Sequence, residues 1–90
     1  MLDLNISAQF KKDRRRCIKH GYNMGLLNAV VNTLLIPASL PPINKDHPLS
    51  GNWINHQECH IQSDWLLIYR IDGNDLYLDR TGTHADLFGE

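Results

Sequence analysis

Residues 65–81 read WLLIYRIDGNDLYLDRT, and this stretch decides the fold. Residues 65–69 show no alternation of apolar and polar side chains, which is typical of a strand that is covered on both faces. Residues 72–75, DGND, form a strong turn signal, and residues 75–81 again favour a strand. The stretch therefore predicts an antiparallel hairpin at the centre of a sheet.

The N-terminal part of the chain predicts a strand followed by a helix. Residues 2–6 alternate apolar and polar side chains, as a short strand does. Ser7 is a suitable N-cap for a helix that extends to about His20, where Gly21 ends it. The side chains expected to point inward from this helix are Phe10, Cys17 and Ile18.

A second helix is expected over roughly 23–36, and a further strand over about 52–60, before the hairpin. The apolar stripe of this helix is Leu27, Val30, Val31, Leu34 and Leu35. Four prolines between these two elements predict a long loop without regular structure: Pro37, Pro41, Pro42 and Pro48. The order β-α-α-β-β-β predicts one α+β domain over residues 1–90, with two helices packed on one face of a mainly antiparallel four-stranded sheet.

Charge is distributed unevenly along this chain of 90 residues, whose net charge is only −1. Residues 1–20 contain six basic and two acidic side chains, whereas the rest of the chain is acidic. The basic residues are Lys11, Lys12, Arg14, Arg15, Arg16 and Lys19. Such a cluster indicates either a polyanion partner or a solvated helix face, and charge alone leaves both open.

Two further features bear on where the protein acts. The first seven residues lack the basic start and long apolar run of a signal peptide, and no stretch is apolar enough for a membrane span. Cys17 and Cys59 show no disulfide-framework spacing. We therefore expect a reduced, cytoplasmic protein without a membrane contact.

Five residues with chemically useful side chains are expected to meet at one edge of the sheet. His60 ends one strand, Asp64 begins the next, and Arg80 and His84 lie at the end of the last. The proline-containing loop could bring His47 to them. Taken singly, each residue could instead be an ordinary surface or turn residue, and Arg80 could pair with a neighbouring carboxylate.

These residue types suit RNA cleavage by internal attack of the ribose 2′-hydroxyl. One histidine can take a proton while another gives one, and an arginine can hold the phosphate as charge develops. Trp65 and Phe88 offer rings for a base to stack on, although both could equally be core residues. Trp53 is expected in the core, and His20 and His56 on the surface.

Three stretches carry a resemblance to a known family: KDHPLSGNW, ECHIQSDWLLIYRI and LYLDRTGTHADLF. With the basic opening FKKDRRRCIKHG, they resemble the YafQ branch of the RelE/ParE superfamily, the toxins of bacterial type II toxin–antitoxin systems. The resemblance covers nearly the whole chain. It implies a RelE-like fold and a ribosome-dependent, metal-independent endoribonuclease that cleaves mRNA.

The resemblance also implies roles for individual residues. The family motifs place catalytic groups at His47, His60, Asp64, Arg80 and His84. Substrate contacts would come from Trp65 and Phe88, and contacts with the ribosome from the six basic residues of the first helix. Many relatives have an arginine where this chain has Gln57, which implies a weaker phosphate or ribosome contact there.

The partners implied are a cognate DinJ/RelB-like antitoxin, the ribosome with its 16S rRNA, and mRNA. The toxin would be monomeric within a larger toxin–antitoxin assembly, and no cofactor is implied. Two alternatives stay open: a non-catalytic toxin that inhibits by binding, and a zinc module. The second would use His47, Cys59, His60 and His84, although neighbouring Cys59 and His60 should point to opposite faces of a strand.

Overall fold

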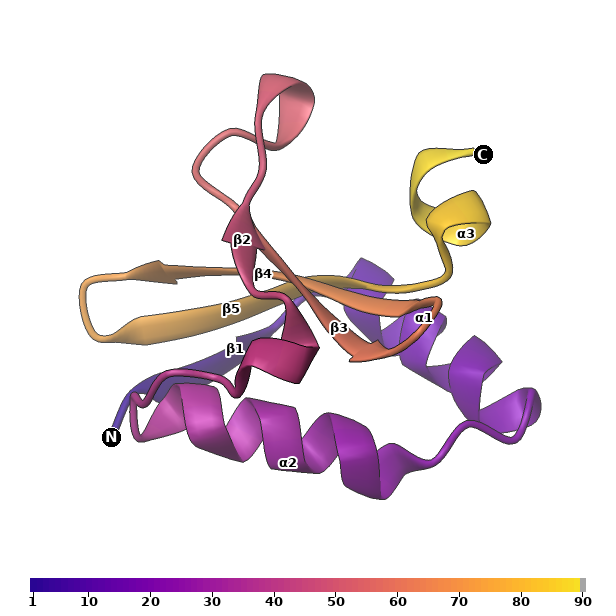
Figure 1. Cartoon of the computed structure of the whole chain (residues 1–90), viewed down its shortest axis with the longest axis horizontal. Helices are drawn as coiled ribbons and strands as arrows, with labels where there is room; N and C mark the ends of the chain where they lie inside the picture. Colours follow the sequence, from indigo (N-terminus) through magenta and orange to yellow (C-terminus); the bar gives the residue numbers. More distant parts are fainter. Residues whose placement is uncertain (90) are drawn as a thin grey trace.

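The computed structural model describes residues 1–89, which fold around a five-stranded sheet (Figure 1). The strands follow the spatial order β1–β5–β4–β3–β2, so that β4 is central. β1 runs parallel to β5, and the other neighbours are antiparallel. The strands are β1 (Asp3–Ile6), β2 (His47–Pro48), β3 (Gln57–Gln62), β4 (Trp65–Asp72) and β5 (Asp75–Gly82). The predicted α+β architecture is confirmed, with a fifth, two-residue strand added at one edge.

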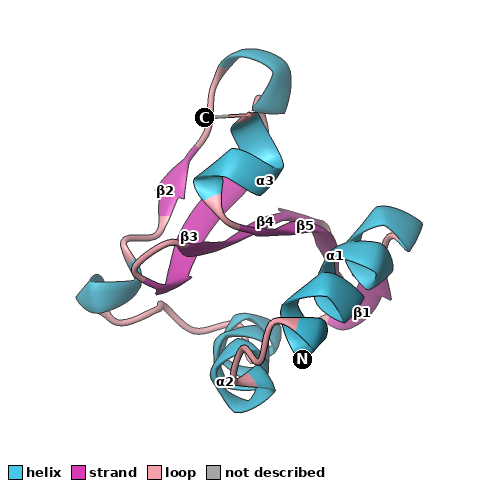
Figure 2. Ribbon diagram, turned by 90° about the vertical axis from the view of Figure 1, so that its right-hand side faces the viewer, coloured by secondary structure: helices cyan, strands magenta, loops and turns pink. Residues whose placement is uncertain are grey.

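The two expected helices are α1 (Ala8–Lys19) and α2 (Met24–Leu35). Ser7 caps α1, because its side chain accepts a hydrogen bond from the backbone N–H of Phe10 at 2.9 Å. Figure 2 shows both helices on one side of the sheet and a short third helix, α3 (His84–Phe88), on the other. Within residues 1–89, no helix is long and apolar enough to cross a bilayer.

Side chains of β4 alternate between two apolar clusters, one on each face of the sheet. Trp65, Leu67 and Tyr69 belong to the larger cluster beneath α1 and α2. Leu66 and Ile68 point the other way and pack against α3 and the segment before β3. The uninterrupted apolar run at residues 65–69 is thus explained, because both faces of β4 are covered.

The segment with four prolines is more regular than we expected. It contains two short 3₁₀ helices, η1 (Pro42–Asn44) and η2 (Gly51–Trp53), as well as β2. Proline fits the first turn of such a helix, whose N–H would be unpaired anyway, and Pro48 lies in an edge strand. The strand expected over 52–60 begins only at Gln57, because η2 takes up its first residues.

Two side chains lie further out than predicted. Ile18 is 54% exposed, because the buried stripe of α1 is formed by Phe10, Asp13 and Cys17, and Ile18 lies about 100° further round the helix than Cys17. Trp53, predicted to be in the core, is only half-buried and packs against the smaller apolar cluster from outside.

Candidate active site

Three side chains of the site share the sheet face that α1 and α2 leave uncovered. Glu58 pairs with Ile68 and His60 with Leu66, so both point to the side of the smaller apolar cluster. His47 pairs with Glu58 across β2 and β3 and points the same way. The proline-containing segment therefore does bring His47 to this face, as the sequence predicts.

His84 is positioned by a turn and a capped helix at the end of β5. It is the first residue of α3, whose N-cap Thr83 forms a reciprocal capping box with Asp86. Gly82, at φ +154°, precedes the cap. A Cβ atom at Gly82 would lie 3.0 Å from both Cβ and Oδ2 of Asp86, so a larger residue would displace the cap.

Asp64 holds His84 through two contacts with one carboxylate oxygen. Oδ1 accepts the backbone N–H of His84 at 3.1 Å and lies 2.7 Å from its Nδ1. Since an ionised carboxylate can only accept, Nδ1 of His84 carries the proton in this contact. These bonds from the His84 backbone and ring hold the pKa of Asp64 below its usual value.

Four rings form a row across the site. The centroids of His47 and His60 are 6.5 Å apart, those of His60 and His84 6.0 Å, and those of His84 and Phe88 6.3 Å. Phe88 is half-buried against the smaller apolar cluster. The structure therefore brings His47, His60, Asp64 and His84 together, as the sequence predicts, and places Phe88 at the end of the row.

Glu58 is a member of the site that the sequence analysis missed. Its side chain is 5% exposed, and its Oε1 lies 3.4 Å from Nε2 of His47 and 3.8 Å from Nε2 of His60. Nδ1 of His47 donates to the backbone oxygen of Lys45 at 2.7 Å, so a hydrogen bond to Glu58 requires a second proton on that ring. The signal for Glu58 was its position two residues before His60, which places both on one face of a strand.

Arg80 is on the histidine face, opposite Ile68, but its guanidinium group turns toward α1. Nε lies 2.7 Å from Oδ2 of Asp13, and one terminal nitrogen lies 3.2 Å from Oδ1. The sequence allowed a pair with a neighbouring carboxylate, but neither Asp79 nor Asp86 is bonded to Arg80 in the described part of the chain. Among residues 1–89, the hydrogen bonds of the Arg80 side chain go to Asp13, so the structure ties Arg80 to α1.

Trp65 cannot stack on a base in this structure, so that prediction is wrong. The side chain is 2% exposed and lies in the larger cluster, on the helix-covered face. Its indole N–H donates to the hydroxyl of Thr81 at 2.9 Å, and its ring lies 5.0 Å from that of Tyr22. Gln57 pairs with Tyr69 and faces the same way, so it does not line the row of histidines.

The zinc module considered from the sequence does not form, because Cys59 faces away from the histidines. It is fully buried in the larger cluster, and burial raises the pKa of its thiol to about 12. A different set of ligands is available among the described residues. Glu58, His60 and His84 each offer an atom within 4.8 Å of the others, a spacing that suits a metal ion.

The basic residues of α1 divide into exposed and internally bonded side chains. Arg16 lies 2.8 Å from Asp13 and 3.8 Å from Asp86, and Arg14 stacks over Phe10 at 5.9 Å. The exposed members are Lys11, Lys12, Arg15 and Lys19. Arg16 is therefore a structural residue in part, and the exposed four are better placed for contacts with RNA.

Comparisons with known proteins agree on one family. The family model described as "Bacterial toxin of type II toxin-antitoxin system, YafQ" matches residues 2–89. The mRNA interferase toxin YafQ of Escherichia coli K12 is 42% identical over 89 residues, which cover 97% of this chain and 96% of that protein.

Two solved structures are similar over nearly the full length of both chains. A copper-bound mutant toxin from Helicobacter pylori has a TM-score of 0.94 and 39% identity, covering 98% of this chain and 100% of that one. The toxin in the Escherichia coli DinJ–YafQ complex has a TM-score of 0.91 and 38% identity, covering 99% and 100%. The fold of this chain is thus that of a known toxin and of a toxin bound to its antitoxin.

Proposed function

The chain belongs to the YafQ family of bacterial type II toxins, and from that membership we propose how its site cleaves mRNA. It is the toxin component of a toxin–antitoxin pair and an endoribonuclease of the mRNA interferase class, with a cognate antitoxin as partner. The geometry of the site in this chain supports the catalytic roles that we assign to its residues.

The dyad of Asp64 and His84 carries the proposal. A carboxylate 2.7 Å from Nδ1 fixes the orientation of the imidazole and stabilises it when it is doubly protonated. Nε2 can then exchange a proton with the ribose or with the leaving oxygen. In the reaction the 2′-oxygen forms a bond to phosphorus, the bond from phosphorus to the 5′-oxygen breaks, and one proton moves at each end.

The second proton transfer falls to the imidazoles beside Glu58. The ring of His60 lies 6.0 Å from that of His84, so a phosphate between them could contact both. Glu58 faces Nε2 of His60 and of His47, where a carboxylate stabilises a ring that carries an extra proton. We assign His60 the direct role, with His47 and Glu58 beside it.

Arg80 would hold the phosphate while keeping its bond to Asp13. A guanidinium group has five N–H donors, and Asp13 takes two of them. The other three donors would be left for an anion, and the Arg80 side chain is 21% exposed. The exposed side chains of α1 would contact ribosomal RNA, so that cleavage takes place on the ribosome and in the cytoplasm.

Whether a metal takes part is a separate question. We predict that catalysis needs none, since two imidazoles and a guanidinium supply both proton transfers and the charge stabilisation. Glu58, His60 and His84 do fit a metal ion by the spacing of their ligand atoms, and one relative, a mutant toxin from Helicobacter pylori, has been solved with copper bound. An ion held by Glu58, His60 and His84 would occupy the nitrogen lone pairs that proton transfer requires.

Single-turnover cleavage of ribosome-bound mRNA by His84→Ala tests the proposal. Proton-transfer catalysis predicts a loss of about 10²–10⁴-fold in rate, with ribosome binding and thermal stability nearly unchanged. The matched control is His20→Ala, which removes an exposed histidine beyond the end of α1 and should cleave normally. Cleavage by His84→Ala within about threefold of the unchanged protein would remove His84 from the mechanism.

The same cleavage assay distinguishes this mechanism from the alternative, a toxin that inhibits by binding alone. A toxin that inhibits only by binding would arrest translation without producing a cleaved mRNA, and His84→Ala would still arrest it. The row of three imidazoles favours catalysis, because inhibition by binding alone needs no acid–base groups.

A further inference from the structure

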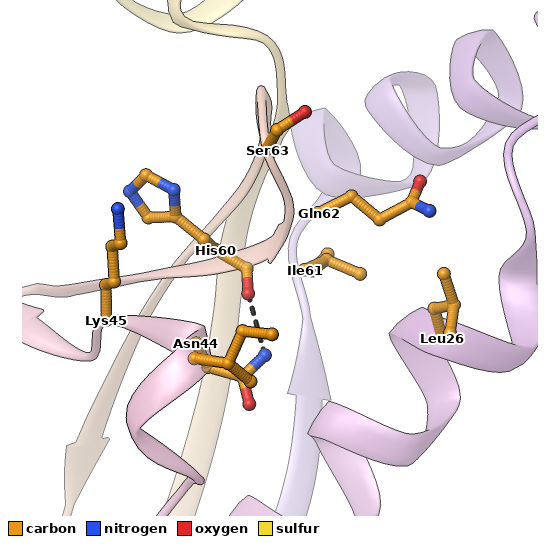
Figure 3. Close-up of a pocket in the computed structure, with 8 residues that line it drawn as sticks. Leu26, Asn44, Lys45, His60, Ile61, Gln62 and Ser63 are labelled. Atoms are coloured by element: carbon orange, nitrogen blue, oxygen red, sulfur yellow. Dashed lines mark hydrogen bonds between the residues drawn. The ribbon is translucent and has the colours of Figure 1, made fainter.

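A groove with a volume of about 700 Å³ opens beside His60, between η1 and the start of α2 (Figure 3). Apolar side chains of Leu26, Ile43 and Ile61 line part of it. Polar groups of Asn44, Lys45, Gln62 and Ser63 line the remainder. None of these residues takes a role in the proposed proton transfers, so the groove has no function assigned so far.

The groove is joined to the catalytic residues through the backbone. Asn44 donates a hydrogen bond from Nδ2 to the backbone oxygen of His60 at 2.7 Å, which Figure 3 shows as a dashed line. Lys45 has a left-handed backbone at φ 48°, and its carbonyl accepts the Nδ1 proton of His47 at 2.7 Å. Asn44 in η1 and its cap residue Lys45 therefore hold one wall of the groove in a fixed position relative to the imidazoles of His60 and His47.

We propose that this groove binds the base of the mRNA nucleotide next to the cleaved phosphate, a site that rests on the function proposed above. Its volume lies within the usual range of about 300–1,000 Å³ for small-molecule sites. His60 lines the groove and also belongs to the row of rings, so a nucleotide adjoining the reacting phosphate lies within reach. No carboxylate lines it among the described residues, which favours an anionic chain.

Each part of the groove has a counterpart in a nucleotide. Ile43 is 83% exposed, and covering such a side chain with the flat face of a base is favourable. The amides of Asn44 and Gln62 and the hydroxyl of Ser63 offer donors and acceptors to a base edge. Lys45 lines the same groove as His60, and Figure 3 draws both side chains, so the ammonium group of Lys45 is available to the neighbouring phosphate.

The groove could instead bind a segment of the antitoxin, and the experiment distinguishes this from binding of an mRNA base. Ile43→Ala and Gln62→Ala alter the groove, and Ile54→Ala is the matched control, because Ile54 is 65% exposed but outside the groove. The readouts are the single-turnover rate on saturating ribosomes, the spread of rates over mRNAs that differ only in the base flanking the cut, and the affinity for the antitoxin.

The groove variants should cleave about 5- to 50-fold more slowly and discriminate less between flanking bases, since one base contact is typically worth that much. Their ribosome affinity should equal that of Ile54→Ala. Rates and base preference equal to the control would overturn the inference, as would a loss confined to antitoxin affinity. If His84→Ala cleaves normally, the proposed mechanism fails instead, and base preference in the Ile43 variant still tests the groove.

Discussion

Asp13 and Arg80 join the basic helix to the last strand through a two-point contact, with Nε 2.7 Å from Oδ2 and a terminal nitrogen 3.2 Å from Oδ1. Asp13 is fully buried, and it also accepts from Arg16, from Gln9 and from the backbone N–H of Thr81. A buried carboxylate with several donors holds its partners in one geometry. Asp13 is therefore a positioning residue for Arg80 as well as a link between α1 and β5.

This arrangement predicts unequal effects of removing the two partners. Asp13→Ala leaves the donors of Arg80, Arg16 and Thr81 without their acceptor, and should lower the free energy of unfolding by roughly 3–5 kcal/mol. Arg80→Ala leaves Asp13 with its other donors and should cost only about 1–2 kcal/mol. Urea denaturation of both variants measures the difference. Equal destabilisation would show that Asp13 is not the centre of the network.

Asp13 illustrates what the sequence alone could not provide. Asp13 is three residues from Phe10 and four from Cys17, a spacing that places it in the buried stripe of α1. The local sequence does not identify its partner, Arg80, which is 67 residues away. Arg80 was predicted as a site residue, but its bond to Asp13 depends on how α1 packs along β5. Long-range polar pairs of this kind are set by tertiary packing, which local patterns do not encode.

The positions of the histidines could be predicted from the sequence, because strand alternation and a turn signal determine them. His60 and His84 follow from the ends of β3 and β5, and the structure confirms that they meet. Trp65 shows the opposite case. The apolar run at residues 65–69 predicts a strand covered on both faces, and such a strand leaves no exposed ring at Trp65 for a base to stack on.

Acid should detach α3 before the protein unfolds. The pKa of Asp64 is lowered by hydrogen bonds from His84, and that of Asp86 by the backbone N–H of Thr83. A lowered pKa in the folded state means that the stabilisation is present above the ordinary carboxyl pKa of about 4 and is lost as pH falls through the lower folded values. Amide hydrogen exchange should therefore show α3 losing protection below roughly pH 4.

The control for acid detachment is Asp64→Asn, which cannot ionise. In this variant α3 should already be less protected at pH 7, and the change on acidification should be smaller. Protection of α3 that is constant down to roughly pH 2.5, in the unchanged protein, would contradict the role given to both carboxylates.

Ribosome affinity should depend on the exposed basic side chains of α1. Reversal of charge at Lys12 and Arg15 should weaken binding and reduce the slope of log affinity against log salt, because fewer counterions are released. Arg16→Glu should instead destabilise the fold, since it puts a second carboxylate beside Asp13. Binding that does not change at low salt in the Lys12 and Arg15 variant would exclude α1 as the contact.

Transition-metal ions should inhibit cleavage rather than support it. Glu58, His60 and His84 have ligand atoms within 4.8 Å of one another, and an ion there would take the imidazole nitrogens that move protons. Cleavage should therefore persist in excess EDTA, fall when Zn²⁺ or Cu²⁺ is added, and recover on chelation. Affinity for the ion should rise with pH, since metal ligands bind in their deprotonated form. Isothermal titration with Glu58→Gln, which lacks one anionic ligand, should show weaker binding. Cleavage that stops in EDTA and returns only with added metal would show instead that the ion is required, and would overturn the metal-independent mechanism.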